Sequence, residues 1–298
     1  MDISTQEDNF FSIWIVHRED IPDVFYHLSR TFMELIGYTA SLFVGIVLGL
    51  IGAGGSMLII PVLIYLFSIQ VLEATSYSLV IIGLTSSVGA IQRFKKSCID
   101  LKIGLFLGMP SIISMFLIRK WILPLTPDII YESQEILILK RHLILLVFSL
   151  LIFTASYIMI TKKSLIEGNK KGQHLLFYII QGAFIGLLTG FVGIGGGFLI
   201  IPVLIFIAGL PFEKAVGTSL FIIAIKSLTG FSADLITYNF NWVFLLCIVL
   251  FTISGIFIGN YLSFHFQTAP MKRYFGWFTL LVGISVLLKE TLIVFQIN

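Results

Sequence analysis

Eight long stretches of this chain contain no Asp, Glu, Lys, Arg or His, except for one lysine within the sixth. They cover residues 35–72, 74–92, 103–118, 143–161, 175–212, 215–233, 235–264 and 274–288. A helix needs about 20 apolar residues to cross a bilayer. Charged residues make up only 12% of the chain and its mean hydropathy is +1.02, against about 25% charged residues in a soluble domain. The pattern predicts an all-α, polytopic transmembrane helical protein in a lipid bilayer and excludes an ordinary soluble enzyme.

The first and fifth stretches, residues 35–72 and 175–212, are equal in length and longer than the others, and three stretches of ordinary transmembrane length follow each of them. We call these two the long stretches. Residues 45–64 align with residues 186–205 without a gap, and we call the constant spacing between aligned residues the repeat offset. Five glycines and one proline coincide in this alignment, which chance similarity between apolar segments does not explain. The sequence therefore predicts two homologous repeats, each with a Gly-broken helix and about three further spans.

Four regions follow from this interpretation. They are an N-terminal extension (1–34), transmembrane repeat 1 (35–161), a basic cytoplasmic linker (162–174) and transmembrane repeat 2 (175–298).

Clusters of glycine lie near the middle of both long stretches. The glycines that we expect to form a binding site are Gly52, Gly54 and Gly55 in the first stretch, and Gly193, Gly195, Gly196 and Gly197 in the second. A continuous helix of this length would measure about 57 Å, at ~1.5 Å per residue, nearly twice the ~30 Å hydrocarbon core. The helix should therefore break at the glycines, which tolerate unusual backbone angles.

A break at membrane depth is tolerated only where the freed backbone groups are buried in protein or line a cavity. The half-helix that follows would point its free N–H groups and its positive dipole end at the break, an arrangement that binds anions. Paired breaks of this kind in two halves are typical of transporter sites. The alternative is close helix packing through small residues, which suits Gly45, Gly49, Gly186 and Gly190.

Lys226 is the one cation inside an apolar stretch, and Thr85 is its counterpart at the repeat offset. An ionisable group at this depth usually faces a cavity or a partner. We favour an anion-binding role for Lys226 over snorkelling to the interface. A direct pair with Asp234 is not expected, because eight helical residues span about 12 Å. Further candidate hydroxyl donors are Ser86, Thr218 and Ser219, whereas Gln92 and Arg93 end a stretch and should mark the interface.

The doubled motif resembles that of a known family. Gly-x-Gly-Gly, an apolar run and Pro-x-Leu are followed by Ala-x-x-x-Ser-Leu at residues 74–79 and Ala-Val-Gly-Thr-Ser-Leu at residues 215–220. The pattern is similar to that of the sulfite exporter TauE/SafE family over roughly residues 35–288. The resemblance implies a permease for sulfite, organosulfonates or related sulfur compounds, commonly in the bacterial inner membrane. The first repeat departs from the fuller pattern, since Ser56 stands where the second has Gly197.

The direction of the two repeats depends on how the long stretches cross the membrane. A single crossing gives four spans per half and parallel repeats, whereas a stretch that folds back or crosses twice gives an odd number and inverted repeats. The excess of Lys and Arg on the cytoplasmic side is the same in both arrangements. The length of the stretches favours inversion.

These features predict a secondary transporter for a small anionic substrate, located in the cell (inner) membrane as a multi-pass protein, with no cofactor, no metal and no nucleic-acid partner. Either a proton or a sodium ion could couple to transport, and the oligomeric state is open. The alternatives are an anion channel, a carboxylate transporter, or an integral-membrane enzyme or scaffold. An enzyme would need a cluster of acids, histidines or a nucleophile with its base at membrane depth, and only Lys226 is there.

Overall fold

The computed structural model describes residues 23–52, 54–127, 129–132, 137–161, 175–193, 196–235, 240–263, 276–277 and 280–288. The predictions for residues 1–22, for the linker at 162–174 and for Gly195 lie outside these residues. The predicted boundary at residue 34 falls inside a helix that begins at Asp23.

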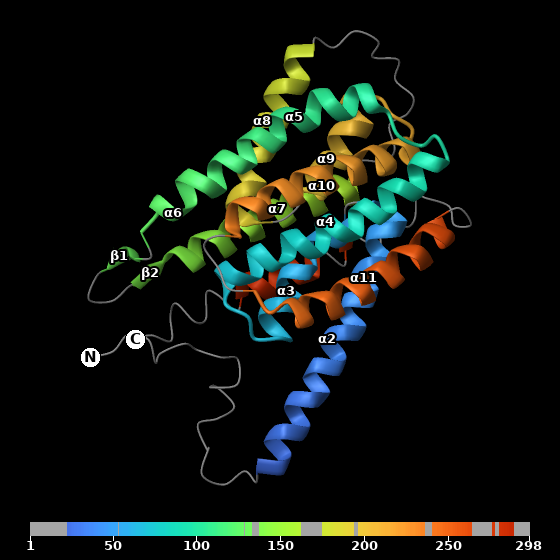
Figure 1. Cartoon of the computed structure of the whole chain (residues 1–298). Coiled ribbons are helices and arrows are strands. Elements are labelled where there is room, and N and C mark those ends of the chain that lie inside the picture. The colour runs from blue at the N-terminus through green and yellow to red at the C-terminus, as the bar shows by residue number, and fades with distance from the viewer. Residues whose placement is uncertain are drawn as a thin grey trace.

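Helices form nearly all of the described structure (Figure 1). The long ones are α2 (Asp23–Ile51), α4 (Val71–Lys95), α5 (Leu101–Leu117), α7 (Lys140–Thr161), α8 (Leu175–Val192), α10 (Phe212–Asp234) and α11 (Trp242–Ser263). The short helical segments are η2 (Gly54–Met57), α3 (Ile59–Tyr65), η3 (Ile118–Ile122), α6 (Leu123–Leu125), α9 (Gly197–Pro202) and η4 (Val203–Ile207).

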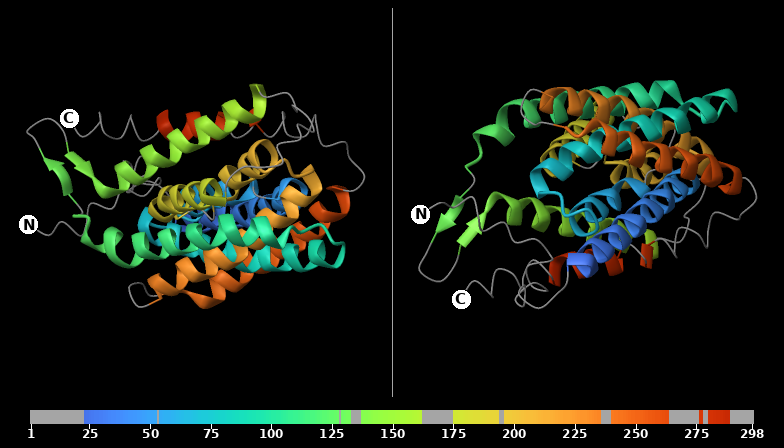
Figure 2. Two further views of the ribbon diagram at one scale, coloured as in Figure 1. Left: turned by 90° about the horizontal axis from the view of Figure 1, so that it is seen from above. Right: turned by 60° about the horizontal axis from the view of Figure 1, so that its bottom comes forward.

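Five helical spans of the described chain are long and apolar enough to cross a membrane. They are Phe32–Ile51, Val71–Lys95, Leu101–Leu125, Phe212–Asp234 and Trp242–Ser263. The two strands β1 (Ile129–Glu132) and β2 (Leu137–Leu139) form a small antiparallel hairpin between α6 and α7, at one edge of the molecule (Figures 1 and 2). The predicted class, an all-α polytopic membrane protein, is confirmed.

Helices α4 and α10 form the centre of the molecule, because most of their residues are buried whereas fewer than half are in the other three spans. They pack in opposite directions. Ser76 near the start of α4 bonds to Asp234 at the end of α10, and Gly83 faces Leu228 in the middle. Gly217 near the start of α10 faces the end of α4. We call this arrangement the α4–α10 crossing.

Two further helix pairs pack through glycines. Helix α2 runs parallel to α11, with Gly45 against Thr252 and Gly259 against Ile46. Helix α5 runs parallel to α8 in the same way, since Gly182 lies against Leu107 and Gly186 against Ser111. Small residues let helix backbones approach closely inside a membrane, so these contacts have the form that the packing alternative predicts for Gly45 and Gly186.

The first long stretch folds back after its glycine cluster. Gly52 lies against Val216, near the start of α10, whereas α4 begins at the other end of the crossing. Phe67, after the end of α3, packs on Tyr38 near the middle of α2, with ring centroids 5.3 Å apart. The segment between Gly52 and α4 therefore returns along the bundle.

The second long stretch also folds back. Gly193, just after α8, lies against Thr75 near the start of α4, and α10 begins at the opposite end of the crossing. Segments α9 and η4 therefore run back between these two ends. The two returning segments meet, since α9 and η2 are in contact.

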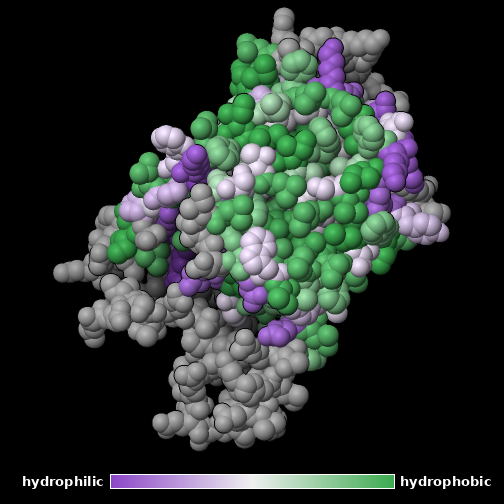
Figure 3. Space-filling model, viewed as in Figure 1, coloured by the Kyte–Doolittle hydropathy of each residue, from purple (hydrophilic) through white to green (hydrophobic). Residues whose placement is uncertain are grey.

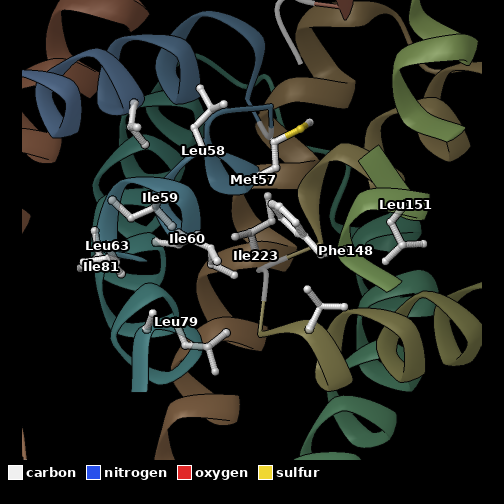
Figure 4. Close-up of a cluster of buried hydrophobic side chains, with 14 of the residues drawn as sticks. Met57, Leu58, Ile59, Ile60, Leu63, Leu79, Ile81, Phe148, Leu151 and Ile223 are labelled. Atoms are coloured by element: carbon white, nitrogen blue, oxygen red, sulfur yellow. The ribbon is translucent and has the colours of Figure 1, made fainter. Parts of the chain in front are cut away.

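The buried core joins these segments to α7. Met57 of η2, Ile223 of α10 and Phe148 of α7 belong to one cluster of fully buried side chains (Figure 4). Outside this core, one face of the molecule is covered mainly by hydrophobic residues, with hydrophilic ones gathered toward its margins (Figure 3). That distribution suits a protein surrounded by lipid.

Candidate functional site

Lys226 lies near the middle of the α4–α10 crossing and its side chain is fully buried. Its Nζ atom has no hydrogen-bond partner among the described residues. An ammonium group carries three donors and no acceptor, and a buried charge without a partner is costly. The amine of Lys226 is therefore suited to bind a negatively charged group or a group with several hydrogen-bond acceptors.

Gly196 forms one wall beside this amine. Its backbone has a φ of +76°, in the left-handed region, and it directly precedes α9. A methyl group on Gly196 would lie 2.6 Å from Lys226 Nζ and 2.5 Å from Thr189 Cγ2. Glycine is therefore needed here for two reasons. Its backbone angle is unfavourable for other residues, and the amine and Thr189 lie too close to leave space for a side chain.

Three buried hydroxyls without a hydrogen-bond partner in the described structure lie on the helices around Lys226. They belong to Ser86 of α4, Ser111 of α5 and Ser227 of α10. Helix α5 runs alongside α10, with Gly108 facing Ile222 and Gly230 facing Met115. This register places Ser111 at the level of Lys226.

Thr85, the counterpart of Lys226, has a different environment. Its Oγ1 lies 2.7 Å from Thr252 Oγ1 and also donates to the carbonyl of Ile81. Gly55, the counterpart of Gly196, packs on the backbone of Val44 and Leu48 in α2. The matching position in the first half therefore holds a closed hydroxyl pair and apolar packing instead of a cation.

The other predicted site residues lie away from Lys226. Thr218 and Ser219 are buried in the first turns of α10, where Thr218 Oγ1 accepts a hydrogen bond from Asp100 N and Ser219 Oγ donates to Val216 O. Gly52 is at the same level, beside Val216. At ~1.5 Å per residue, Thr218 and Ser219 are about 11 Å from Lys226 along the helix axis, and Val216 is about 15 Å away. The structure thus brings together Lys226 and Gly196, but not Thr218, Ser219 or Gly52.

The remaining predicted glycines lie in the short returning segments. Gly54 and Gly55 are in η2, and Gly197 is the first residue of α9. Gly193 has a φ of +79° and faces Thr75 at the start of α4 and Arg119 of η3.

Arg119 of η3 makes an extensive polar network, which its position in the sequence did not indicate. Its side chain is fully buried and forms an ion pair with Asp234. The guanidinium also donates to Ser76 Oγ at 3.2 Å, to Thr75 Oγ1 at 2.7 Å and to Gly190 O at 3.2 Å. Asp234 is therefore the partner of Arg119 and not of Lys226.

Arg93 occupies the opposite end of the crossing. The sequence suggested an interfacial position, but only 2% of the residue is exposed. Its Nε donates to Asn260 Oδ1 at 3.1 Å, and a terminal nitrogen donates to Gly49 O at 3.1 Å and to Ser263 Oγ at 2.6 Å. Helix α11 and the end of α2 cover this side chain, and its position at the membrane interface stays a prediction.

A signal for both arginines was present in the sequence. At the repeat offset, Arg119 aligns with Asn260 and Arg93 aligns with Asp234. Asn260 lies inside an apolar stretch, four residues before its end, and each arginine is aligned with a polar residue of the other half. The adjacent basic residue Lys120 made Arg119 resemble an ordinary loop charge.

Within the described residues, no group of three or more His, Cys, Asp or Glu side chains could hold a metal ion. A buried lysine whose amine has no partner among these residues, between two central helices and inside a shell of apolar helices, is typical of a polytopic helical membrane protein with an internal polar site. The chain belongs to the sulfite exporter TauE/SafE family, whose model matches residues 38–286. It is therefore a membrane transporter.

Curated relatives carry the same general description. A probable membrane transporter protein of Xylella fastidiosa (strain 9a5c) is 26% identical over 258 residues, which cover 83% of this chain and 92% of the relative. The probable membrane transporter protein YdhB of Bacillus subtilis (strain 168) is 29% identical over 217 residues, covering 72% and 84% respectively. No solved structure gives a significant match to this chain.

Proposed function

We propose that this transporter is a secondary permease for a small anion, with Lys226 as the anion ligand. The fully buried Lys226 Nζ, which has no partner among the described residues, carries the proposal. A charged group inside a membrane protein usually marks a substrate or ion pathway. An anion in contact with this amine would satisfy its three donors and neutralise its charge.

The surrounding groups support an oxyanion. Three hydroxyls on α4, α5 and α10, which have no hydrogen-bond partner among the described residues, can donate hydrogen bonds, and the backbone of Gly196 lies close to the amine. We propose sulfite, an organosulfonate or a related sulfur compound as substrate, in line with the family. A carboxylate offers similar acceptors and is the second candidate.

The arrangement of the helices supports inverted repeats. Helices α4 and α10 occupy matching positions at the repeat offset and run in opposite directions through the crossing. The contact of Gly45 with Thr252 has its counterpart in that of Gly186 with Ser111. Repeats of this kind support alternating access around a site at their interface. We propose the cell (inner) membrane as the location of the protein, in line with the family.

The test is to remove the charge at position 226. Lys226→Met keeps the length and apolar stem of the side chain, and Lys226→Arg keeps its charge. Charge-assisted hydrogen bonds contribute about 1.5–3 kcal/mol, so we expect Met to weaken the apparent affinity by roughly one to two orders of magnitude. Arg should be intermediate. Initial rates against sulfite concentration in proteoliposomes measure the effect.

Lys102→Met is the matched control, because Lys102 is exposed on α5 and the same chemical change there should leave the kinetics as they are. Acetate and a short alkyl sulfonate, run beside sulfite, distinguish the candidate substrates. Counterflow distinguishes a carrier from a channel. An unchanged apparent affinity in Lys226→Met would reject Lys226 as the anion ligand.

A further inference from the structure

We propose that two arginine networks at opposite ends of the α4–α10 crossing are the two gates of the transport path. Arg119 with Asp234 closes one side, and Arg93 with Asn260 closes the other. The proposal rests on the proposed function, because a gate has a role only if the site around Lys226 is reached from both sides of the membrane.

The gate at Arg119 joins four elements. The guanidinium comes from η3, its carboxylate partner is at the end of α10, and Thr75 and Ser76 are at the start of α4. Its bond to Gly190 O reaches the end of α8. Ser76 Oγ also donates to Asp234 Oδ2 at 2.6 Å. Segments from before and after the 162–174 linker are thus tied together at this end.

The gate at Arg93 joins the corresponding elements of the opposite halves. The guanidinium comes from the end of α4, Asn260 and Ser263 are near the end of α11, and Gly49 is near the end of α2. Asn260 Nδ2 donates in turn to Gln92 Oε1 at 2.6 Å. This network contains an amide where the first has a carboxylate.

The two networks are built from the same two aligned positions. The position that holds the arginine in one network holds its hydrogen-bond acceptor in the other. The repeat offset takes Arg119 to Asn260 and Arg93 to Asp234. In both networks a guanidinium donates to the carbonyl of a matching glycine, Gly190 or Gly49. Simple helix packing does not require an arginine at both ends, whereas a path that opens alternately needs a closure on each side.

The site lies between the two closures. Asp234 is eight residues after Lys226 on α10, about 12 Å along the axis, and Gly217, which faces Arg93, is nine residues before it. Lys226 itself is fully buried. The structure is therefore closed at both ends, and access from either side requires one network to separate. Lys95 and Lys96 follow Arg93, so the positive-inside rule places that end in the cytoplasm.

The experiment measures access to the site from each side. Cys98 and Cys247 are replaced by Ser, and Ser227→Cys provides one buried thiol beside Lys226. A membrane-impermeant maleimide is then added to right-side-out and to inside-out membrane vesicles without any substrate. With both gates intact, labelling should be slow from either side.

The variants should open opposite sides. Asp234→Asn should speed labelling at least tenfold from the extracytoplasmic side only, and Asn260→Leu should do so from the cytoplasmic side only. Since a lone buried Arg119 could impair folding, the double variant Arg119→Gln with Asp234→Asn removes both charges. Ser76→Ala, which removes one hydrogen bond and keeps the ion pair, should give a smaller increase on the same side as Asp234→Asn.

Asp100→Asn is the matched control, because this carboxylate caps the first turn of α5 by accepting from Ile103 N at 3.0 Å and lies outside both networks. The proposal of two gates would be overturned if the Asp234 and Asn260 variants sped labelling from the same side, or if well-folded variants showed no faster labelling. Labelling needs no anion, so this outcome is separate from the affinity test of Lys226. If Lys226→Met leaves the apparent affinity unchanged but the labelling results are as expected, the two gates remain supported and only the role of Lys226 as anion ligand is rejected.

Discussion

Lys226 and Thr85 occupy matching positions near the centre of the molecule, and their chemistry is unequal. Thr85 is satisfied by Thr252 and Ile81, whereas the amine of Lys226 has no partner in the described chain. In the proposed site, the second half would therefore provide the amine and the first half would provide packing. An anion held at this point would sit off the midline between the halves, closer to α9 than to η2.

A prediction at this scale concerns Gly196. Gly196→Val should abolish sulfite transport in proteoliposomes, because the side chain would strain a backbone with φ of +76° and press on Lys226 Nζ and Thr189. Such a conformation costs non-glycine residues on the order of 1–3 kcal/mol. The measurement is the initial rate of transport by protein with verified membrane insertion.

Gly108→Ala is a suitable comparison for Gly196→Val. The nearest atoms that a methyl group there would meet belong to the side chain of Ile222, the closest at 3.3 Å, and the backbone conformation allows alanine, so transport should persist. Full activity of Gly196→Val would show that the glycine serves packing alone.

At the residue scale, the sequence predicted one part of the candidate site, Lys226, and missed another, the two buried arginines. A lysine in an apolar stretch is visible without a structure, because its desolvation is costly wherever the helix lies. Arg119 and Arg93 stand at the ends of apolar stretches, where burial depends on which helices cover them. Which helices cover a side chain is a property of the tertiary structure. In the sequence, only the alignment of the two halves indicated that these arginines have polar partners.

At the level of elements, the two glycine clusters change the direction of the chain. The length and composition of the long stretches predicted a break, and the structure places Gly52 and Gly193 at opposite ends of the α4–α10 crossing. The reversal could not be derived from residue types, since a kinked single crossing contains the same glycines. It depends on the core that receives η2 and α9, including Met57 and Phe148.

The glycine contacts between parallel helices lead to a second prediction. Gly259→Leu should lower the thermal stability of the purified protein in detergent, because even a Cβ at this position overlaps the carbonyl of Ile46 on α2. Overpacking of this kind costs typically about 1–3 kcal/mol. Gly104→Ala, whose added methyl would lie 3.3 Å from Thr218 Cγ2, should have a much smaller effect. Equal melting temperatures for Gly259→Leu and the parent protein would contradict the close approach of α2 and α11.

For the whole molecule, ligand binding and stability should be linked. An anion that binds the folded site but not the unfolded chain stabilises the fold by about 2.7 kcal/mol at a concentration 100 times its Kd. Sulfite or a related oxyanion should therefore raise the melting temperature by several degrees, and Lys226→Met should reduce that rise. Potassium chloride at equal ionic strength is the control for general salt effects. A rise of the same size in Lys226→Met would place the anion elsewhere.

The parallel pairs α2–α11 and α5–α8 also determine how the molecule holds together. Each pair joins a helix from before the 162–174 linker to one from after it, so the two halves of the chain are entwined instead of standing side by side. Neither half can cover its own glycine faces, and each completes the other. The protein should accordingly unfold as a single cooperative body, and a chain cut within the linker should regain its structure only when both fragments are made in the same membrane.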